Sequence, residues 1–207
     1  MYATSLLSRF MQKPSQKHYG AARRILRYLQ GTQEYDIHYQ STEDSKLLGY
    51  TDSDWAGSID DMKSTSGYVF TLGSGVFSWA SKKQETVAQS SAEAEYVAAA
   101  NATSQAIWLR KIFEDIREQQ EGPTTMLCDS KSAIAMTNNS VYHSRTKHIA
   151  IKYHFIREAI LEKKIKIEYC NTEEQLADIF TKALPRTKFE LFRQMLGVTQ
   201  MCIKEEY

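Results

Sequence analysis

Four acidic residues fall at positions where predicted strands and helices begin or end. Asp52 follows the first strand of a predicted sheet, and Asp129 follows the fourth. Glu95 lies in the first turns of a long predicted helix, and Asp178 lies in the last one. Sites in open sheets form beyond the carboxyl ends of strands, particularly where the strand order reverses. If the first and fourth strands are parallel neighbours, Asp52 and Asp129 should therefore lie side by side.

Clustered carboxylates are suited to one kind of chemistry. They repel one another, which raises their pKa values unless cations share the site. Hard oxygen ligands of this kind suit Mg²⁺, which keeps several waters and accepts phosphate oxygens of a substrate. Two such ions roughly 3.5–4 Å apart can activate a water and stabilise the leaving oxygen of an in-line phosphoryl displacement. The sequence has no nucleophilic Ser or Cys motif, which agrees with such a reaction.

Taken singly, the same residues have structural explanations. Asp52 and Asp54 could be turn residues after a strand. Asp129 could cap the helix that follows it, and Asp178 could be a solvated helix residue. Glu93 is better explained by helix capping than by catalysis. Asp54 also rivals Asp52 as the first metal ligand, because residues i and i+2 of a strand share a face. Position alone leaves these alternatives open.

The elements that must position these residues alternate between strands and helices. Gly73-Ser74-Gly75 predicts a hairpin turn between two aromatic and β-branched runs. Ser90 and Glu93 form an S-x-x-E capping box for the long helix, which Gly122-Pro123 stops. The order predicts a mixed sheet with helices on its faces. The predicted strands cover residues 47–51, 67–72, 76–80, 124–128 and 164–169, and the predicted helices cover 90–116, 130–136, 147–161 and a last segment beginning near Thr172.

Changes in composition divide the chain into three predicted segments: a helical segment at residues 1–44, an α/β domain at 45–185 and a C-terminal helical tail at 186–207. The first segment is too small to be stable alone, so we expect its helix, which Gly31 ends, to pack on something else. The apolar stripe of that helix consists of Ala22, Ile25, Leu26 and Leu29.

The overall composition describes a soluble protein of nearly balanced charge. The chain has 207 residues, 42% of them hydrophobic, and a formal net charge of +1. This charge predicts no strong overall attraction to nucleic acid, so such a partner must be held by a local basic patch or by metal ions. The three cysteines make no disulfide framework, and no apolar run approaches the ~18 residues needed to span a bilayer. We expect an intracellular protein without a membrane partner.

Six ordered sequence blocks surround the acidic residues and resemble the ribonuclease H region of Ty1/Copia-type LTR retrotransposon polyproteins. The match extends over nearly the whole chain to about Gly197, and the segment at residues 22–31 (ARRILRYLQG) resembles the end of the reverse transcriptase just upstream. The blocks are GYTDSDWAG at 49–57, KSTSGYVF at 63–70, SSAEAEYVA at 90–98, CDSKSA at 128–133, RTKHI with YHFIR within 145–157, and QLADIFTK at 175–182.

The resemblance implies an RNase H-like α/β fold with a five-stranded mixed sheet, and a metal site formed by Asp52, Glu95, Asp129 and Asp178. In the family mechanism Asp52 bridges two Mg²⁺ ions, for which Mn²⁺ can substitute. Asp178 shares the ion that prepares the water, and Glu95 and Asp129 hold the ion facing the leaving 3′ oxygen. The reaction is endonucleolytic hydrolysis of the RNA strand of an RNA–DNA hybrid during reverse transcription, which leaves a 5′-phosphate and a 3′-hydroxyl. The remainder of a reverse transcriptase is an implied partner, and cytoplasmic virus-like particles or the nucleus are implied locations.

The sequence departs from the family pattern in two ways. The loop at residues 171–175 has no histidine, which many cellular relatives carry there, and this puts assisted product release in doubt. No basic insertion follows Asp129, which suggests weak binding of hybrid by the isolated domain. The polymerase motifs are absent altogether. A catalytically inactive, host-adopted nucleic-acid-binding or interaction module is therefore the alternative function, and a structural segment of a reverse transcriptase is a third.

Contacts with a hybrid are expected at two places. Gln89, Ser90 and Ser91 are candidates for reading the 2′-hydroxyls of the RNA strand or for receiving a phosphate at the helix start, with capping as the alternative. A basic excess at residues 145–166 suits backbone contacts, unless it is a solvated helix face. Its basic residues are Arg145, Lys147, Lys152, Arg157, Lys163, Lys164 and Lys166. The tryptophans are expected in the core rather than as base-stacking platforms: Trp55, Trp79 and Trp108.

Overall fold

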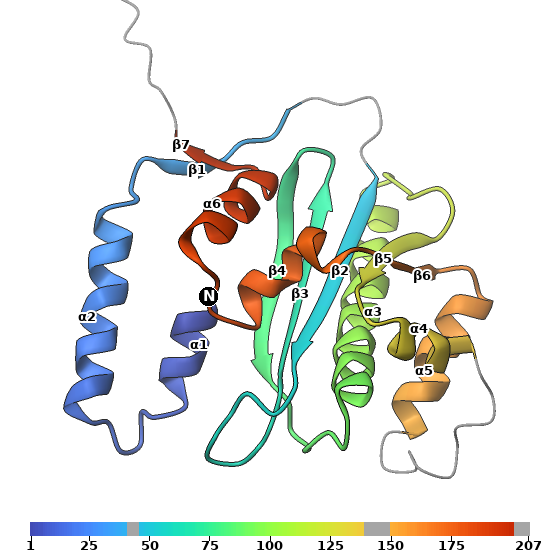
Figure 1. Ribbon diagram of the computed structural model, residues 1–207. Coiled ribbons are helices and arrows are strands. Elements are labelled where there is room, and N and C mark those ends of the chain that lie inside the picture. The colour runs from blue at the N-terminus through green and yellow to red at the C-terminus, as the bar shows by residue number, and fades with distance from the viewer. Residues whose placement is uncertain (41–45, 139–149, 201–207) are drawn as a thin grey trace, which may run out of the picture.

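The computed structural model describes residues 1–40, 46–138 and 150–200. Its centre is a five-stranded sheet in the order β4-β3-β2-β5-β6 (Figure 1). β3 is antiparallel to β2 and β4, whereas β5 is parallel to β2 and β6. This mixed sheet confirms the predicted fold class, and the first and fourth predicted strands are parallel neighbours. The strands are β2 (Leu47–Asp54), β3 (Thr65–Leu72), β4 (Gly75–Lys83), β5 (Thr124–Cys128) and β6 (Ile165–Tyr169).

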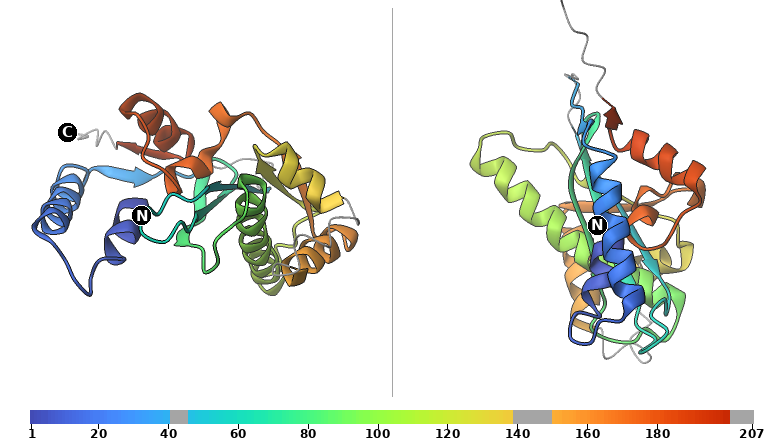
Figure 2. Two further views of the ribbon diagram at one scale, coloured as in Figure 1. Left: turned by 60° about the horizontal axis from the view of Figure 1, so that its bottom comes forward. Right: turned by 90° about the vertical axis from the view of Figure 1, so that its left-hand side faces the viewer.

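Helices cover both faces of the sheet. The long helix α3 (Ser91–Asp115) packs on one face with α4 (Lys131–Asn138) and α5 (Ala150–Leu161). The short helix η4 (Leu176–Phe180) and α6 (Arg186–Met195) lie on the opposite face (Figure 2). Successive strand residues point to opposite faces, so each face has its own apolar cluster. The α3 side includes Phe70, Tyr96 and Ile156, and the η4 side includes Val69, Phe180 and Phe192.

The start of α3 follows the predicted capping pattern with one change. The Ser90 hydroxyl accepts a hydrogen bond from the Glu93 backbone N–H at 3.2 Å, as an N-cap should. The Glu93 carboxylate accepts from the backbone N–H of Gln89 at 3.1 Å, one residue earlier than a capping box requires. Both interactions fix the first turn of the helix, on which Glu95 is placed.

α3 ends at Asp115, within one residue of the predicted range but well before the Gly122-Pro123 stop. Arg117 adopts a left-handed backbone conformation with φ of 65°. The N–H of Glu118 donates to the carbonyl of Phe113, and the N–H of Arg117 donates to that of Glu114, which is the hydrogen-bond pattern of a Schellman motif. Such a motif usually has glycine at the left-handed position. The sequence therefore pointed to Gly122 instead.

The last predicted helix is split into two short 3₁₀ helices, η3 (Thr172–Glu174) and η4. Gln175 lies between them in an extended conformation, and its side chain caps η4 by accepting from the N–H of Ala177. The cap of η3 is Asn171, the neighbour of the predicted Thr172. At this interruption the chain changes direction, so that it runs from the end of β6 onto the face of the sheet on which η4 lies.

The N-terminal segment forms α1 (Tyr2–Ser8), α2 (Gln16–Gln30) and β1 (Tyr35–Ile37), and β1 pairs with β7 (Val198–Gln200) in a second, two-stranded sheet. α2 ends at Gly31, as predicted. Its apolar stripe is partly covered, because Ala22 and Ile25 are half-buried whereas Leu26 is 65% exposed and Leu29 is 56% exposed. The helix contacts α1, and Tyr28 packs edge-on against Phe189, so the expectation that it packs on something is met in part.

The tryptophans are not core residues, contrary to the prediction. Trp55 and Trp108 are each 55% exposed, and Trp79 on the edge strand β4 is 40% exposed. Smaller residues fill the interior instead, since α3 buries mostly alanine against the sheet. Within the described residues, none of the helices combines the length and hydrophobicity that a membrane span would need.

Candidate metal centre

The site lies where the parallel pairing of two central strands stops. The last paired residues of β2 and β5 are Tyr50 and Leu127, but β2 continues to Asp54. Beyond this point the backbone of β2 is no longer paired with β5. Side chains from the two faces of the sheet can therefore approach each other there, which they cannot do across a continuous ladder.

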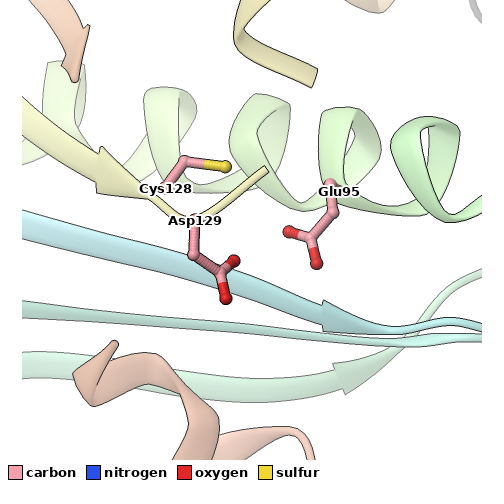
Figure 3. A group of neighbouring side chains, drawn as sticks. All are labelled: Glu95, Cys128 and Asp129. Atoms are coloured by element: carbon pink, nitrogen blue, oxygen red, sulfur yellow. The ribbon is translucent and has the colours of Figure 1, made fainter. Parts of the chain in front are cut away.

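One half of the site consists of Glu95 from α3 and Asp129 from the end of β5. Figure 3 shows their carboxylates directed toward a common space, with Cys128 beside them. Ligand atoms of these three residues lie within 4.8 Å of one another. One Glu95 oxygen accepts from the backbone N–H of Ser53 at 3.2 Å. The other, Oε2, is buried and has no hydrogen-bond partner among the described residues.

The other half of the site consists of Asp52 and Asp178, which are 2% and 1% exposed. The Lys182 ammonium lies between them, 2.8 Å from Asp178 Oδ1 and 3.6 Å from Asp52 Oδ2. The hydroxyl of Thr181 donates to Asp52, and Lys188 Nζ lies 3.4 Å from Asp178 Oδ2. The alternative that Asp178 is a solvated helix residue is therefore wrong.

Two residues without an assigned role in the sequence bring η4 against the sheet. Gln175 is fully buried, and its amide donates to the carbonyl of Thr51 at 3.0 Å while its oxygen accepts from Ala177. Gly67 pairs with Asp52, and a Cβ at Gly67 would lie 2.7 Å from Thr181 Cγ2. The missing side chain thus lets η4 approach β3 closely, which places Asp178 beside Asp52.

A third buried residue fixes the start of α3. Gln84 follows β4, and its Nε2 lies 3.2 Å from Ser53 Oγ, 2.9 Å from Ser66 Oγ and 2.9 Å from the Ala94 carbonyl. It therefore links α3 to both β2 and β3, one residue before Glu95. A polar residue just after a strand gives no sequence signal for such a role, because its partners come from three other elements.

The electrostatics of the site favour a cation. The pKa of Asp52 is raised to about 6, mainly by burial and also by the charges of Asp178 and Asp129, against the attraction of Lys182 and the hydrogen bond from Thr181. Burial also raises the pKa of Glu95 well above its ordinary value, with added repulsion from Asp52 and Asp129. The pKa of Asp52 is raised by Asp129, and the pKa of Glu95 is raised by Asp52, so each group is influenced by a charge from the other half of the site. The two halves of the site are therefore close enough to influence each other electrostatically.

The donor set fits a hard divalent cation. Four carboxylates supply oxygen ligands, and Glu95 Oε2 is a buried acceptor with no partner among the described residues. Oxygen ligands suit Mg²⁺ or Mn²⁺. Burial and the charge of Glu95 raise the pKa of the Cys128 thiol, so it stays protonated near neutral pH and is a poor ligand. Asp52, Glu95, Asp129 and Asp178 are the residues that could hold such ions.

The single-residue alternatives can be compared with the structure. Asp54 accepts a hydrogen bond from the backbone N–H of Thr65 at the start of β3, whereas Asp52 interacts with Asp178, Asp129 and Lys182. The helix N-cap after β5 is Ser130, whose hydroxyl accepts from Ala133 at 3.2 Å. Asp129 instead accepts from the Thr172 hydroxyl at 2.9 Å. The acidic cluster therefore contains Asp52 and Asp129 rather than Asp54.

The predicted substrate contacts are only partly described. Gln89, Ser90 and Ser91 are exposed at the start of α3, and capping occupies the Ser90 hydroxyl and the Gln89 N–H. Lys152 is half-buried, and burial lowers its pKa against the attraction of Glu85. Two further residues of the predicted basic stretch, Arg145 and Lys147, lie outside the described residues.

Curated relatives match nearly the whole chain. It is 43% identical over 197 residues to the retrovirus-related Pol polyprotein from transposon TNT 1-94 of Nicotiana tabacum, covering 95% of this chain and 15% of that protein. It is 42% identical over 200 residues to the corresponding polyprotein from transposon RE1 of Arabidopsis thaliana, covering 97% of this chain and 14% of that protein. The chain thus spans only a small part of these relatives. A stretch of 107 residues is 50% identical to secreted RxLR effector protein 161 of Plasmopara viticola, covering 52% of this chain and 75% of that protein.

No family model matches the chain. Among solved structures, the N-terminal RNase H domain of rv2228c from Mycobacterium tuberculosis is similar, with a TM-score of 0.50 and 16% identity. This match covers 72% of the present chain and 97% of that chain, and at such low identity it concerns the fold alone. Over nearly its whole length the chain is similar to a part of the Pol polyproteins of transposons TNT 1-94 and RE1, and its fold is RNase H-like.

Proposed function

We propose that this protein hydrolyses the RNA strand of RNA–DNA hybrids with the help of two divalent metal ions. The observation that carries the proposal is the convergence of Asp52, Glu95, Asp129 and Asp178, which come from two strand ends, α3 and η4. Buried carboxylates that repel one another are costly to keep unless they bind cations. The relationship to retrotransposon Pol polyproteins supports an RNA–DNA hybrid as the substrate.

Each carboxylate has a distinct place in this proposal. Two Mg²⁺ ions would activate a water and stabilise the leaving 3′ oxygen. Asp52 interacts electrostatically with both Asp129 and Asp178, so we assign it to both ions. Glu95 and Asp129 would hold one ion, and Asp178 together with Asp52 would hold the other. The hydrogen bond from Ser53 to Glu95 and that from Thr172 to Asp129 orient these two carboxylates.

Substrate recognition is proposed at the start of α3. Gln89, Ser90 and Ser91 are exposed there, in the turns that precede Glu95. A hybrid carries 2′-hydroxyls on one strand only, and polar side chains can distinguish that strand through them. Lys152 is proposed to contact the nucleic-acid backbone. Its position in α5 places it on the same side of the sheet as the start of α3.

The test is cleavage of a labelled RNA–DNA hybrid by the purified protein in Mg²⁺ and, separately, in Mn²⁺. We expect RNA fragments with 5′-phosphate and 3′-hydroxyl ends. Asp129→Asn should abolish cleavage, because it removes a charged ligand while keeping the shape of the side chain. Asp115→Asn is the matched control, because this exposed residue lies at the far end of α3 and should leave the rate unchanged.

The outcomes separate the proposal from its alternatives. An absence of cleavage over a range of Mg²⁺ and Mn²⁺ concentrations would refute it. Tight binding of hybrid without turnover would support a binding module that no longer cleaves. Equal rates for the wild-type protein and Asp129→Asn would point to a contaminating nuclease.

A further inference from the structure

A lysine of this chain lies within the metal centre. The Lys182 ammonium contacts one oxygen of Asp178 and approaches one of Asp52, and both carboxylates are almost fully buried. The lysine side chain itself is 40% exposed. Its stem therefore reaches from solvent into the site, with the charge directed at the two carboxylates that the proposed mechanism assigns to one ion.

The two halves of the site differ in this respect. Among the residues that the structure describes, no lysine or arginine forms an ion pair with Glu95 or Asp129. Glu95 even retains a buried oxygen with no hydrogen-bond partner there. Within the described residues, one half thus forms direct ion pairs with lysines, and the other half does not.

The Lys182 ammonium and a metal ion would compete for the same carboxylate oxygens. Mg²⁺ binds a carboxylate oxygen at about 2.1 Å, so an ammonium in contact with that oxygen would lie only a few ångströms from the ion, where two positive charges repel. The lysine must therefore withdraw before a metal ion binds Asp52 and Asp178. Its partial exposure gives it a path into water, where a long flexible side chain is well solvated.

A second lysine keeps Asp178 in place during such a change. Lys188 on α6 lies 3.4 Å from the other oxygen of Asp178 and 3.3 Å from the Thr172 carbonyl. Its side chain is only 19% exposed, and its ammonium lies 5.2 Å from the centre of the Phe192 ring. Lys188 is therefore held by several contacts and is less exposed than Lys182, whose side chain is 40% exposed.

We propose that Lys182 is a built-in competitor for the divalent ion at Asp52 and Asp178, so that the two halves of the metal centre fill unequally. The half formed by Glu95 and Asp129 binds its ion first. The half formed by Asp52 and Asp178 binds only when the ammonium withdraws. This inference rests on the metal site of the proposed function, and it adds a residue that tunes how readily the site is filled.

Calorimetric titration with Mn²⁺ tests the inference without any activity measurement. Lys182→Met and Lys182→Gln are compared with the wild-type protein at fixed pH and ionic strength. We expect the weaker of two binding events to strengthen by roughly three- to tenfold, which corresponds to the loss of one partly exposed competing ion pair. Lys166→Met is the control, since Lys166 forms an exposed ion pair with Glu168 on β6 and should leave both affinities unchanged.

Thermal unfolding gives a second measurement for the same variants. In a chelator the Lys182 variants should melt at a lower temperature than the wild type, because two buried carboxylates lose their neutralising charge. Saturating Mn²⁺ should raise their melting temperature by more than it raises that of the wild type. If Lys182 had a purely structural role, its replacement would lower the stability in the chelator but would leave the Mn²⁺ affinity unchanged.

Unchanged or weaker Mn²⁺ affinity in both Lys182 variants would overturn the inference. Weaker hybrid binding at unchanged metal affinity would also overturn it and would make Lys182 a substrate contact. Binding of Mn²⁺ by the variants but not by the wild type would support it. If neither protein bound any divalent ion, both this inference and the proposed function would fail, whereas wild-type binding with an unaffected variant would reject the inference alone.

Discussion

Replacing Asp52 by asparagine should stabilise the metal-free protein at neutral pH while destroying its proposed metal site. Asp52 is 2% exposed, and burial raises the pKa of its carboxyl group to about 6 from an ordinary value of 3.8. The ionised form is therefore held in the folded protein at a cost. Asparagine has no charge, and its oxygen can still accept the hydrogen bond from Thr181.

The magnitude follows from the difference between the two pKa values of Asp52. The folded protein keeps the Asp52 proton between pH 3.8 and about 6, where the unfolded chain has lost it. The free energy of unfolding therefore falls as pH rises through this window. A shift of about 2 units at ~1.4 kcal/mol per unit gives about 3 kcal/mol. Asp52→Asn should gain up to this amount above pH 7 and almost nothing near pH 4.

The assay is urea-induced unfolding in a chelator, followed by tryptophan fluorescence at several pH values between 4 and 8 and at constant ionic strength. Asp115→Asn serves as the control, because it is exposed on α3 far from the site and should change the stability by less than about 0.5 kcal/mol at every pH. Glu95, whose pKa is also raised, contributes a slope of the same sign to all the proteins. The difference between Asp52→Asn and the wild type is therefore the quantity to compare.

The reasoning fails if Asp52→Asn is less stable than the wild type at pH 7.5 in the chelator, or if the difference between them does not depend on pH. Either result would mean that the Asp52 carboxylate is not held at a cost. Saturating Mn²⁺ should reverse the order, because the ion stabilises only a protein with the ionised ligand.

Three further changes test how the site is built. Gly67→Ala should cost about 1–3 kcal/mol of stability, because its Cβ would lie 2.7 Å from Thr181 Cγ2; urea unfolding measures this, and an unchanged midpoint would show that η4 does not need the close approach. Gln175→Leu should cost about 1–3 kcal/mol and reduce cleavage, because it leaves the Thr51 carbonyl without its buried partner; unfolding and hybrid cleavage are measured together, and full activity would contradict a role in placing Asp178. Trp55→Ala should raise the KM for a hybrid several-fold with little change in kcat, because this ring is 55% exposed near the site; steady-state kinetics with an unchanged KM would exclude contact with the substrate.

The sequence alone determined the elements and the chemistry that they carry. Alternating apolar residues, the Gly73-Ser74-Gly75 turn and the Ser90 cap are local signals, so they predicted the β3–β4 hairpin and the start of α3. The carboxylates could be located because they follow those elements directly. The sequence left the pairing of the first and fourth strands as a condition, and their parallel pairing in the structure brings Asp52 and Asp129 to the same point of the sheet.

Only the tertiary structure decided how the site is held together. Asp52 and Asp54 share one face of β2, so the choice between them depended on Thr65 from a neighbouring strand. Gln175 binds a carbonyl 124 residues away in the chain, and no local pattern reports such a contact.

Lys182 was different, because its i, i+4 spacing from Asp178 is a signal for an ion pair that could have been read. The approach of Lys182 to Asp52 could not be predicted from the sequence, because the distance between them depends on the packing of η4 against Gly67. Local sequence thus specifies which groups are present, whereas their electrostatics depend on distances that exist only once the chain has folded.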